Sequence, residues 1–185
     1  MNTEQLQHTA RKLRQPDAPA AATFEACRES LAEELSRRMM VRPDIEKLIG
    51  PGNLPMMQDN SRNFCRFMST MFRGYEPDVL VQTVLWVFRA YRSHGFQPTY
   101  WAANLDTFVE ILRERIAPAS FQSLYPFFQW LIVNIPIFVT ITDGQMSLAS
   151  EEPPSHACDN APRSNACNRQ SVQTSLTPAE GQARL

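Results

Sequence analysis

The chain has 185 residues, of which 43% are hydrophobic and 20% are charged, so it can form one domain with a sizeable core but not two large ones. Its formal net charge of −1 excludes the overall basic excess that is typical of proteins that bind nucleic acids or anionic membranes. The 14 prolines and only 6 glycines disfavour an all-β fold, whose tight turns need glycine.

Composition divides the chain into three zones. Residues 1–22 form a polar arm that ends in the run QPDAPAAA, which is typical of a linker. Residues 23–142 contain every Trp, Tyr and Phe of the chain. Residues 143–185 contain no aromatic residue and cannot bury enough apolar surface to offset the entropy of ordering them, so we expect a disordered tail. One folded domain is therefore expected, at 23–142.

Hydrophobic spacing predicts helices throughout this central zone. The first is expected from about 23 to 41, where Phe24, Cys27, Leu31 and Leu35 recur at helical intervals. Further helices are expected at about 43–49, 57–73, 77–94 and 98–116, and from 118 through at least 135. Prolines at the starts and glycines after the ends of several of these segments support the boundaries. The sequence thus predicts a single all-α domain of five or six helices.

The sequence offers no signal for export or for membrane insertion. It contains no stretch of about 18 uninterrupted apolar residues, and the polar start MNTEQLQHTARKL lacks the apolar centre of a signal peptide. We therefore expect a cytoplasmic protein with no membrane contact. The four cysteines then predict no disulfide framework, and we assign no role to Cys158 and Cys167 in the tail. His156 joins them in an H-x-C pattern, but zinc needs four ligands, so we predict no metal site.

Signatures of catalysis are also missing from the sequence. There is no G-x-x-x-x-G-K-[ST], no G-x-G-x-x-G, no H-E-x-x-H and no G-x-S-x-G. We expect no catalytic residue and therefore a protein that is not an enzyme. Arg62, Arg66 and Arg73 lie close to one face of their predicted helix and could bind phosphate groups. The equal numbers of acidic and basic residues in the central zone favour a solvated helix face instead and make nucleic-acid binding the weaker interpretation.

Two further features are compatible with a ligand between the helices. His94 continues the inward stripe of the helix that begins at Pro77 and could ligate a haem iron; alternatively, it ends that helix by complementing the helix dipole. Aromatic residues gather in the last three predicted helices, where they can form core or line a pocket for a flat or lipid-like ligand. The candidate contacts for such a ligand are His94, Tyr91, Phe64 and Trp101.

A family resemblance rests on the runs MMQDNSRNFCRFMSTMF and YEPDVLVQTVLWVFRAYRSHGFQPTYWAANLDTFVEILRERI. Asp59 lies early in an amphipathic helix, and the Y-x-P-x-x-L pattern of Tyr75, Pro77 and Leu80 begins the next one. The later matching elements are Trp86, Arg89, the turn from Arg92 to Phe96, Tyr100, and the stripe from Leu105 to Leu112. The chain in this way resembles the helical input domains that precede cobalamin-binding or other output modules in bacterial regulators. More broadly it is similar to globin-like sensors, a class that includes haem-free stressosome globins and phycobiliproteins.

The resemblance implies a globin-like fold and a sensory function. It does not imply a cobalamin, because the D-x-H-x-x-G motif of the cobalamin-binding module does not occur. The histidine that such domains carry in the helix around Asp59 is replaced here by Asn63-Phe64. The leading hypothesis is a non-enzymatic regulatory module without a cofactor that acts on a regulatory protein partner or on a second copy of itself. The alternatives are a haem or tetrapyrrole protein that uses His94, and a small helical enzyme or nucleic-acid binder.

Overall fold

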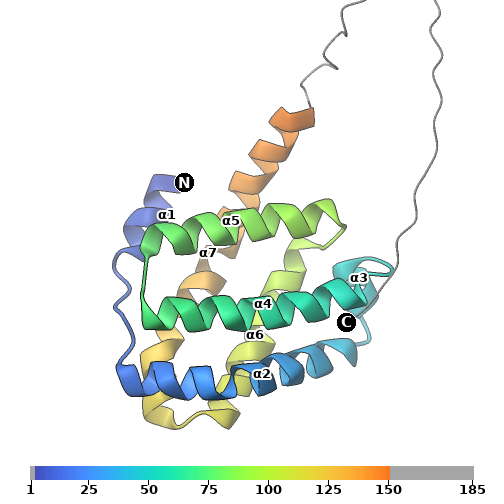
Figure 1. Cartoon of the computed structure of the whole chain (residues 1–185). Helices are drawn as coiled ribbons and strands as arrows, with labels where there is room; N and C mark the ends of the chain where they lie inside the picture. The colour runs from blue at the N-terminus through green and yellow to red at the C-terminus, as the bar shows by residue number, and fades with distance from the viewer. Residues whose placement is uncertain (1–2, 151–185) are drawn as a thin grey trace, which may run out of the picture. The chain divides into compact units, whose positions relative to one another are not determined.

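The computed structural model describes residues 3–150, which form seven α-helices and no strand (Figure 1). The helices are α1 (Thr3–Ala10), α2 (Ala18–Met40), α3 (Ile45–Ile49), α4 (Leu54–Arg73), α5 (Pro77–Ser93), α6 (Pro98–Arg115) and α7 (Pro118–Ser150). The all-α class predicted from the sequence is confirmed, but the helix count of five or six is wrong by at least one.

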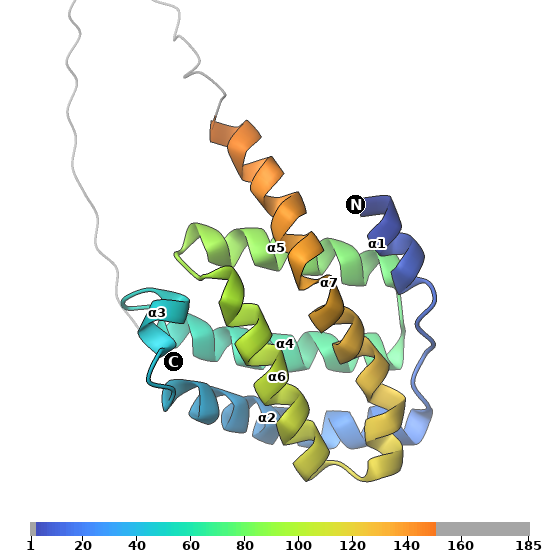
Figure 2. The same ribbon diagram turned by 180° about the vertical axis from the view of Figure 1, so that it is seen from behind.

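The described helices form two layers. In Figure 1, α2, α4 and α5 lie in front in nearly parallel directions, while α6 and α7 cross behind them; Figure 2 shows the reverse face, where α6 and α7 are in front. α4 packs mainly on α2, and α5 packs mainly on α7 and α1. The two consecutive helices α4 and α5 therefore pack on different neighbouring helices. This arrangement leaves a space between α4 and α5, where the site described below lies.

The additional helix lies in the segment that the sequence analysis assigned to a polar arm. α1 buries Leu6 and Ala10, and the Tyr75 hydroxyl donates a hydrogen bond of 2.8 Å to the carbonyl oxygen of Ala10. Composition alone could not reveal this helix, because only two of its residues are fully buried. α2 also begins earlier than predicted, since Asp17 caps it by accepting a hydrogen bond of 2.8 Å from the backbone N–H of Ala20.

The last helix also extends beyond its predicted range. The predicted disordered tail was to begin at Asp143, but α7 continues to Ser150. The sequence from Asp143 to Ser150 contains no proline, and the next one is Pro153. Residues 151–185, which make up the rest of the predicted tail, lie outside the described part of the chain.

α7 is the most apolar helix of the fold. Its segment Pro118–Gly144 has a mean hydropathy of 1.6 and is long and apolar enough to cross a membrane by these two criteria alone. The same helix supplies Leu124, Phe127 and Phe128 to the core, where all three are fully buried. The two prolines inside it, Pro126 and Pro136, both lie on the exposed side, where water can reach the carbonyl groups that they leave without a partner.

Edge-to-face aromatic pairs join helices within the front layer and between the two layers in the core. Phe72 of α4 contacts Phe24 of α2, with ring centroids 4.9 Å apart, and Phe127 of α7, at 5.3 Å. Phe64 of α4 contacts Phe108 of α6 at 5.2 Å. Such pairs contribute about 0.5–1.5 kcal/mol each beyond the burial of their area. They hold α4 against α6 and α7 on one side and thereby fix one wall of the site.

Candidate functional site

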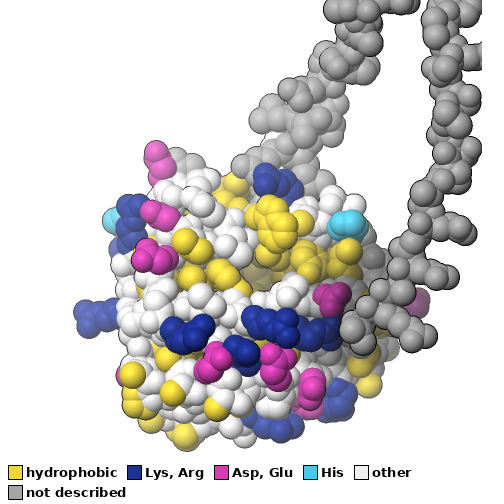
Figure 3. Space-filling model, in the orientation of Figure 1, with side chains coloured by type: hydrophobic (Ala, Val, Ile, Leu, Met, Phe, Trp, Pro, Cys, Tyr) yellow, Lys and Arg dark blue, Asp and Glu magenta, His cyan; other side chains and the backbone are white. Residues whose placement is uncertain are grey.

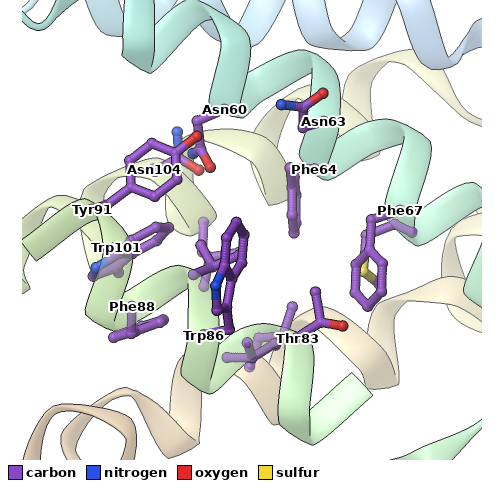
Figure 4. A pocket seen from close by; sticks show the side chains of 15 residues that line it. Asn60, Asn63, Phe64, Phe67, Thr83, Trp86, Phe88, Tyr91, Trp101 and Asn104 are labelled. Atoms are coloured by element: carbon purple, nitrogen blue, oxygen red, sulfur yellow. The ribbon is translucent and has the colours of Figure 1, made fainter. Parts of the chain in front are cut away.

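An apolar cavity of about 280 Å³ lies between α4 and α5, with α6 and α7 contributing to its lining. Because α4 packs mainly on α2 while α5 packs mainly on α7 and α1, side chains rather than close helix packing fill most of the space between them. Figure 4 shows the lining side chains converging from both helices on this space. The apolar members of the lining are Phe64, Phe67, Met68, Val84, Trp86, Val87, Phe88, Trp101, Leu105 and Leu131. Helical bundles commonly place ligand sites in such positions.

Stacked rings form part of the lining on the α5 and α6 side. The Trp101 indole lies nearly parallel to the Phe88 ring, with centroids 4.4 Å apart and an angle of 20° between the planes. Tyr91 meets the same indole edge-on at 5.8 Å. Trp101 Nε1 is buried and has no hydrogen-bond partner among the described residues. In Figure 4 this nitrogen lies on the side of the ring away from Phe64, so we do not count it among the groups that would face a ligand.

Polar groups gather at the end of the cavity nearest Tyr91 (Figure 4). Asn60 of α4 and Asn104 of α6 both line the cavity, yet they are only 5% and 2% exposed. Their Nδ2 groups donate hydrogen bonds of 3.0 and 3.2 Å to the Tyr100 hydroxyl, which positions both amides. Burial raises the pKa of Tyr100, so this hydroxyl stays protonated at neutral pH.

The Tyr91 side chain completes this polar end. It is half-buried, and its hydroxyl has no hydrogen-bond partner among the described residues. The pKa of Tyr91 is raised by burial and, to a smaller extent, by the negative charge of Asp59. The hydroxyl is therefore neutral at physiological pH and can donate or accept one hydrogen bond to a molecule in the cavity.

The cavity opens to solvent beside an exposed tryptophan. Trp86 of α5 belongs to the lining, yet 58% of it is exposed. In the space-filling view of Figure 3, a hydrophobic patch surrounds a hollow on this face, and a band of basic and acidic side chains crosses next to it. A large apolar side chain held in water at the edge of an apolar cavity is a feature of ligand and partner sites.

The structure brings together three of the four residues that the sequence suggested as ligand contacts. Tyr91, Phe64 and Trp101 all line the cavity. His94 does not: it is exposed and occupies the C-cap of α5, where its backbone N–H donates to the Tyr91 carbonyl at 3.0 Å. This position matches the alternative interpretation of His94 as a residue that ends the helix. Its role as an iron ligand stays a prediction that the lining of the cavity does not favour.

Sequence reasoning missed Asn60, Asn104 and the exposure of Trp86. A signal was present for the two amides, because Asn60 precedes Phe64 by four residues and Asn104 follows Trp101 by three. Both are therefore polar residues on otherwise apolar helix faces. No comparable signal existed for Trp86, whose exposure depends on the separation of α4 from α5.

The other candidate groups are engaged in ion pairs or are buried. Arg62 pairs with Asp59, and Arg66 lies 3.5 Å from Glu29, so the arginines of α4 have acidic neighbours. Cys65 is a buried free thiol, and burial raises its pKa. Within the described residues no group of three or more His, Cys, Asp or Glu could hold a metal ion. His156, Cys158 and Cys167 lie outside these residues.

Comparisons of the chain with protein-family models, with curated proteins and with solved structures found no match.

Proposed function

We propose that this chain is a non-enzymatic regulatory module that binds a small, largely apolar ligand between α4 and α5 and responds by contact with a protein partner. The globin-like character implied by the sequence resemblance is part of this proposal. The observation that carries it is the cavity of about 280 Å³, whose lining includes Phe64, Tyr91 and Trp101. Pockets for small molecules are typically concave and mostly apolar, with a few polar groups at defined positions.

The arrangement of the lining suits a sensor. α5 contributes Val84, Val87 and Phe88 to the cavity, and α4 contributes Phe64 and Met68. Because these helices are held by different neighbours, a ligand that fills the space adds contacts between them that the empty protein lacks. A ligand that binds one spacing of α4 and α5 better than another shifts the population toward that spacing. A partner that contacts both helices can then distinguish the two states.

The ligand-binding half of the proposal is tested with N-phenylnaphthylamine, a neutral dye that becomes fluorescent in apolar sites. We expect saturable binding by the wild-type protein. Val87→Trp places a large ring in the cavity and should abolish binding. The matched control is Val79→Trp on the same helix, because Val79 is exposed and does not line the cavity. Equal dye binding by both variants, or none by the wild type, would refute the proposed site.

The partner-contact half is tested by sedimentation of the full chain with and without the dye. We expect dye binding to change the sedimentation of the chain in one of two ways. Either the self-association of the chain changes, or, if a partner protein co-purifies with it, the amount of complex with that partner changes. A chain that stays monomeric in both conditions and associates with no partner would contradict this half of the proposal.

A further inference from the structure

We infer that the ligand of the α4–α5 cavity is an uncharged molecule that carries a hydrogen-bonding group at one end, and that this group lies beside Asn60, Asn104 and Tyr91. The inference rests on the proposed function and specifies the class of ligand and its orientation. Apart from these three residues, the polar side chains in the lining are Asn63 and Thr83, and the tryptophans carry ring N–H groups.

The positions of the polar groups set the orientation. Asn60 and Asn104 are almost completely buried, and Tyr100 holds both of their Nδ2 groups. No described residue donates to the amide oxygen of either asparagine, so each can accept a hydrogen bond from a molecule in the cavity. The Tyr91 hydroxyl, which also lacks a hydrogen-bond partner within the described part of the chain, lies at the same end (Figure 4). The opposite end, around Phe67, is mostly apolar, and Thr83 is the labelled polar residue nearest to it (Figure 4).

The absence of charge from the lining sets the class of ligand. None of the described residues that line the cavity is Asp, Glu, Lys or Arg. An ionised group placed among them would lose its hydration without gaining an ion pair, which is costly. The nearby charge that acts on Tyr91 is that of Asp59, which would repel a carboxylate, and Asp59 is itself paired with Arg62. A hydroxyl, carbonyl or amide group fits this end, whereas a carboxylate or an ammonium does not.

Four compounds with one ring system test this inference: naphthalene, β-naphthol, β-naphthoate and β-naphthylmethylammonium. Their affinities are measured near neutral pH by displacement of N-phenylnaphthylamine from the wild-type protein. We expect β-naphthol to bind at least about ten-fold more tightly than either charged compound, because burying an unpaired charge costs more than 1.4 kcal/mol. Charged compounds that bind as tightly as β-naphthol would overturn the inference.

The orientation is tested with Tyr91→Phe, which removes the hydroxyl but no hydrogen bond between described residues. The affinity ratio of β-naphthol to naphthalene should fall about five-fold, the equivalent of one hydrogen bond of about 1 kcal/mol. Tyr125→Phe is the control, because Tyr125 is half-buried and lies outside the cavity. A ratio that Tyr91→Phe leaves unchanged would overturn the orientation.

The two proposals fail in different ways. If the wild type binds the dye and Val87→Trp does not, but no naphthalene compound discriminates by charge or depends on Tyr91, the cavity is a ligand site and this inference is wrong. If the dye does not bind the wild type at all, the proposed function fails and the inference fails with it.

Discussion

The Nδ2 atom of Asn60 lies 3.0 Å from the hydroxyl oxygen of Tyr100, and this hydrogen bond joins α4 to α6 inside the core. Asn104 donates to the same oxygen from one turn further along α6, at 3.2 Å. A single phenol therefore positions two buried amides that line the cavity. These hydrogen bonds hold the polar end of the site in place in the absence of a ligand. Binding therefore loses little conformational entropy from ordering these side chains.

Replacement of Tyr100 by Phe should destabilise the protein, because both amides lose their acceptor in a buried environment. A buried donor without a partner costs about 1–3 kcal/mol, and we expect a loss of about 2 kcal/mol in the free energy of unfolding. Urea unfolding followed by circular dichroism measures it. Tyr125→Phe, the control, should change the free energy by less than about 0.5 kcal/mol. Equal stabilities of the two variants would show that the Tyr100 hydrogen bonds contribute nothing.

Stability should fall in acid because of Glu34. Its hydrogen bonds from Arg37 and Arg38, at 2.7 and 2.8 Å, lower its pKa to about 2 from an ordinary value of 4.5. A carboxylate with a lowered pKa in the folded state adds stability above about pH 4.5, and this contribution is lost as the pH falls toward 2. Glu34→Gln should therefore reduce the difference in urea midpoint between pH 7 and pH 3.

Glu33→Gln serves as the control for that measurement, because the neighbouring Glu33 is exposed and forms no ion pair with any residue that the structure describes. It should leave the pH dependence of the urea midpoint close to that of the wild type. If Glu33→Gln and Glu34→Gln alter the pH dependence equally, the arginine contacts of Glu34 are not its source.

Cys65 should resist alkylation until the protein unfolds. It is buried, and its pKa is raised mainly by that burial and also by the negative charge of Glu29, so the reactive thiolate is scarce. Cys27 is only half-buried, although its pKa is also raised. Iodoacetamide labelling, with the modified peptides identified by mass spectrometry, should show Cys27 labelled in the native protein and Cys65 only in urea. Labelling of Cys65 at the rate of Cys27 in the native state would show that α4 opens readily.

Haem should not bind through His94. The His94 side chain is exposed at the end of α5 and does not line the cavity. We expect that the protein expressed with excess haem shows no Soret band that depends on this residue. Absorbance spectra of the wild type and of His94→Ala provide the measurement. A Soret band that His94→Ala removes would restore the haem hypothesis and would require a second site outside the cavity.

The helices were predictable because their apolar residues recur with a helical period, and prolines and glycines mark several boundaries. α1 was missed because its buried face consists of only Leu6 and Ala10. The end of α7 was missed because the loss of aromatic residues after Ile141 looks like the end of a fold, whereas the helix continues to Ser150.

The site was predictable only in part. Aromatic clustering in the last three predicted helices pointed to Tyr91 and Trp101, and Phe64 was named with them as a candidate ligand contact; all three line the cavity. The inward stripe of the helix that begins at Pro77 suggested His94, but a stripe on one helix does not reveal where the neighbouring helices end. The contact between Asn60 and Tyr100 joins residues 40 positions apart, and no local pattern specifies such a pair.

The ion pair between Arg92 and Asp143 has a mechanical consequence. Arg92, which is only 17% exposed, also lies 3.4 Å from the Thr142 hydroxyl, so the last turn of α5 is joined to α7 at the point where α7 continues past α5 (Figure 2). Arg92 is the residue after Tyr91. The part of α7 that continues past α5 is thus anchored to α5 one residue from the cavity lining. A displacement of this end of α5 would therefore also displace α7.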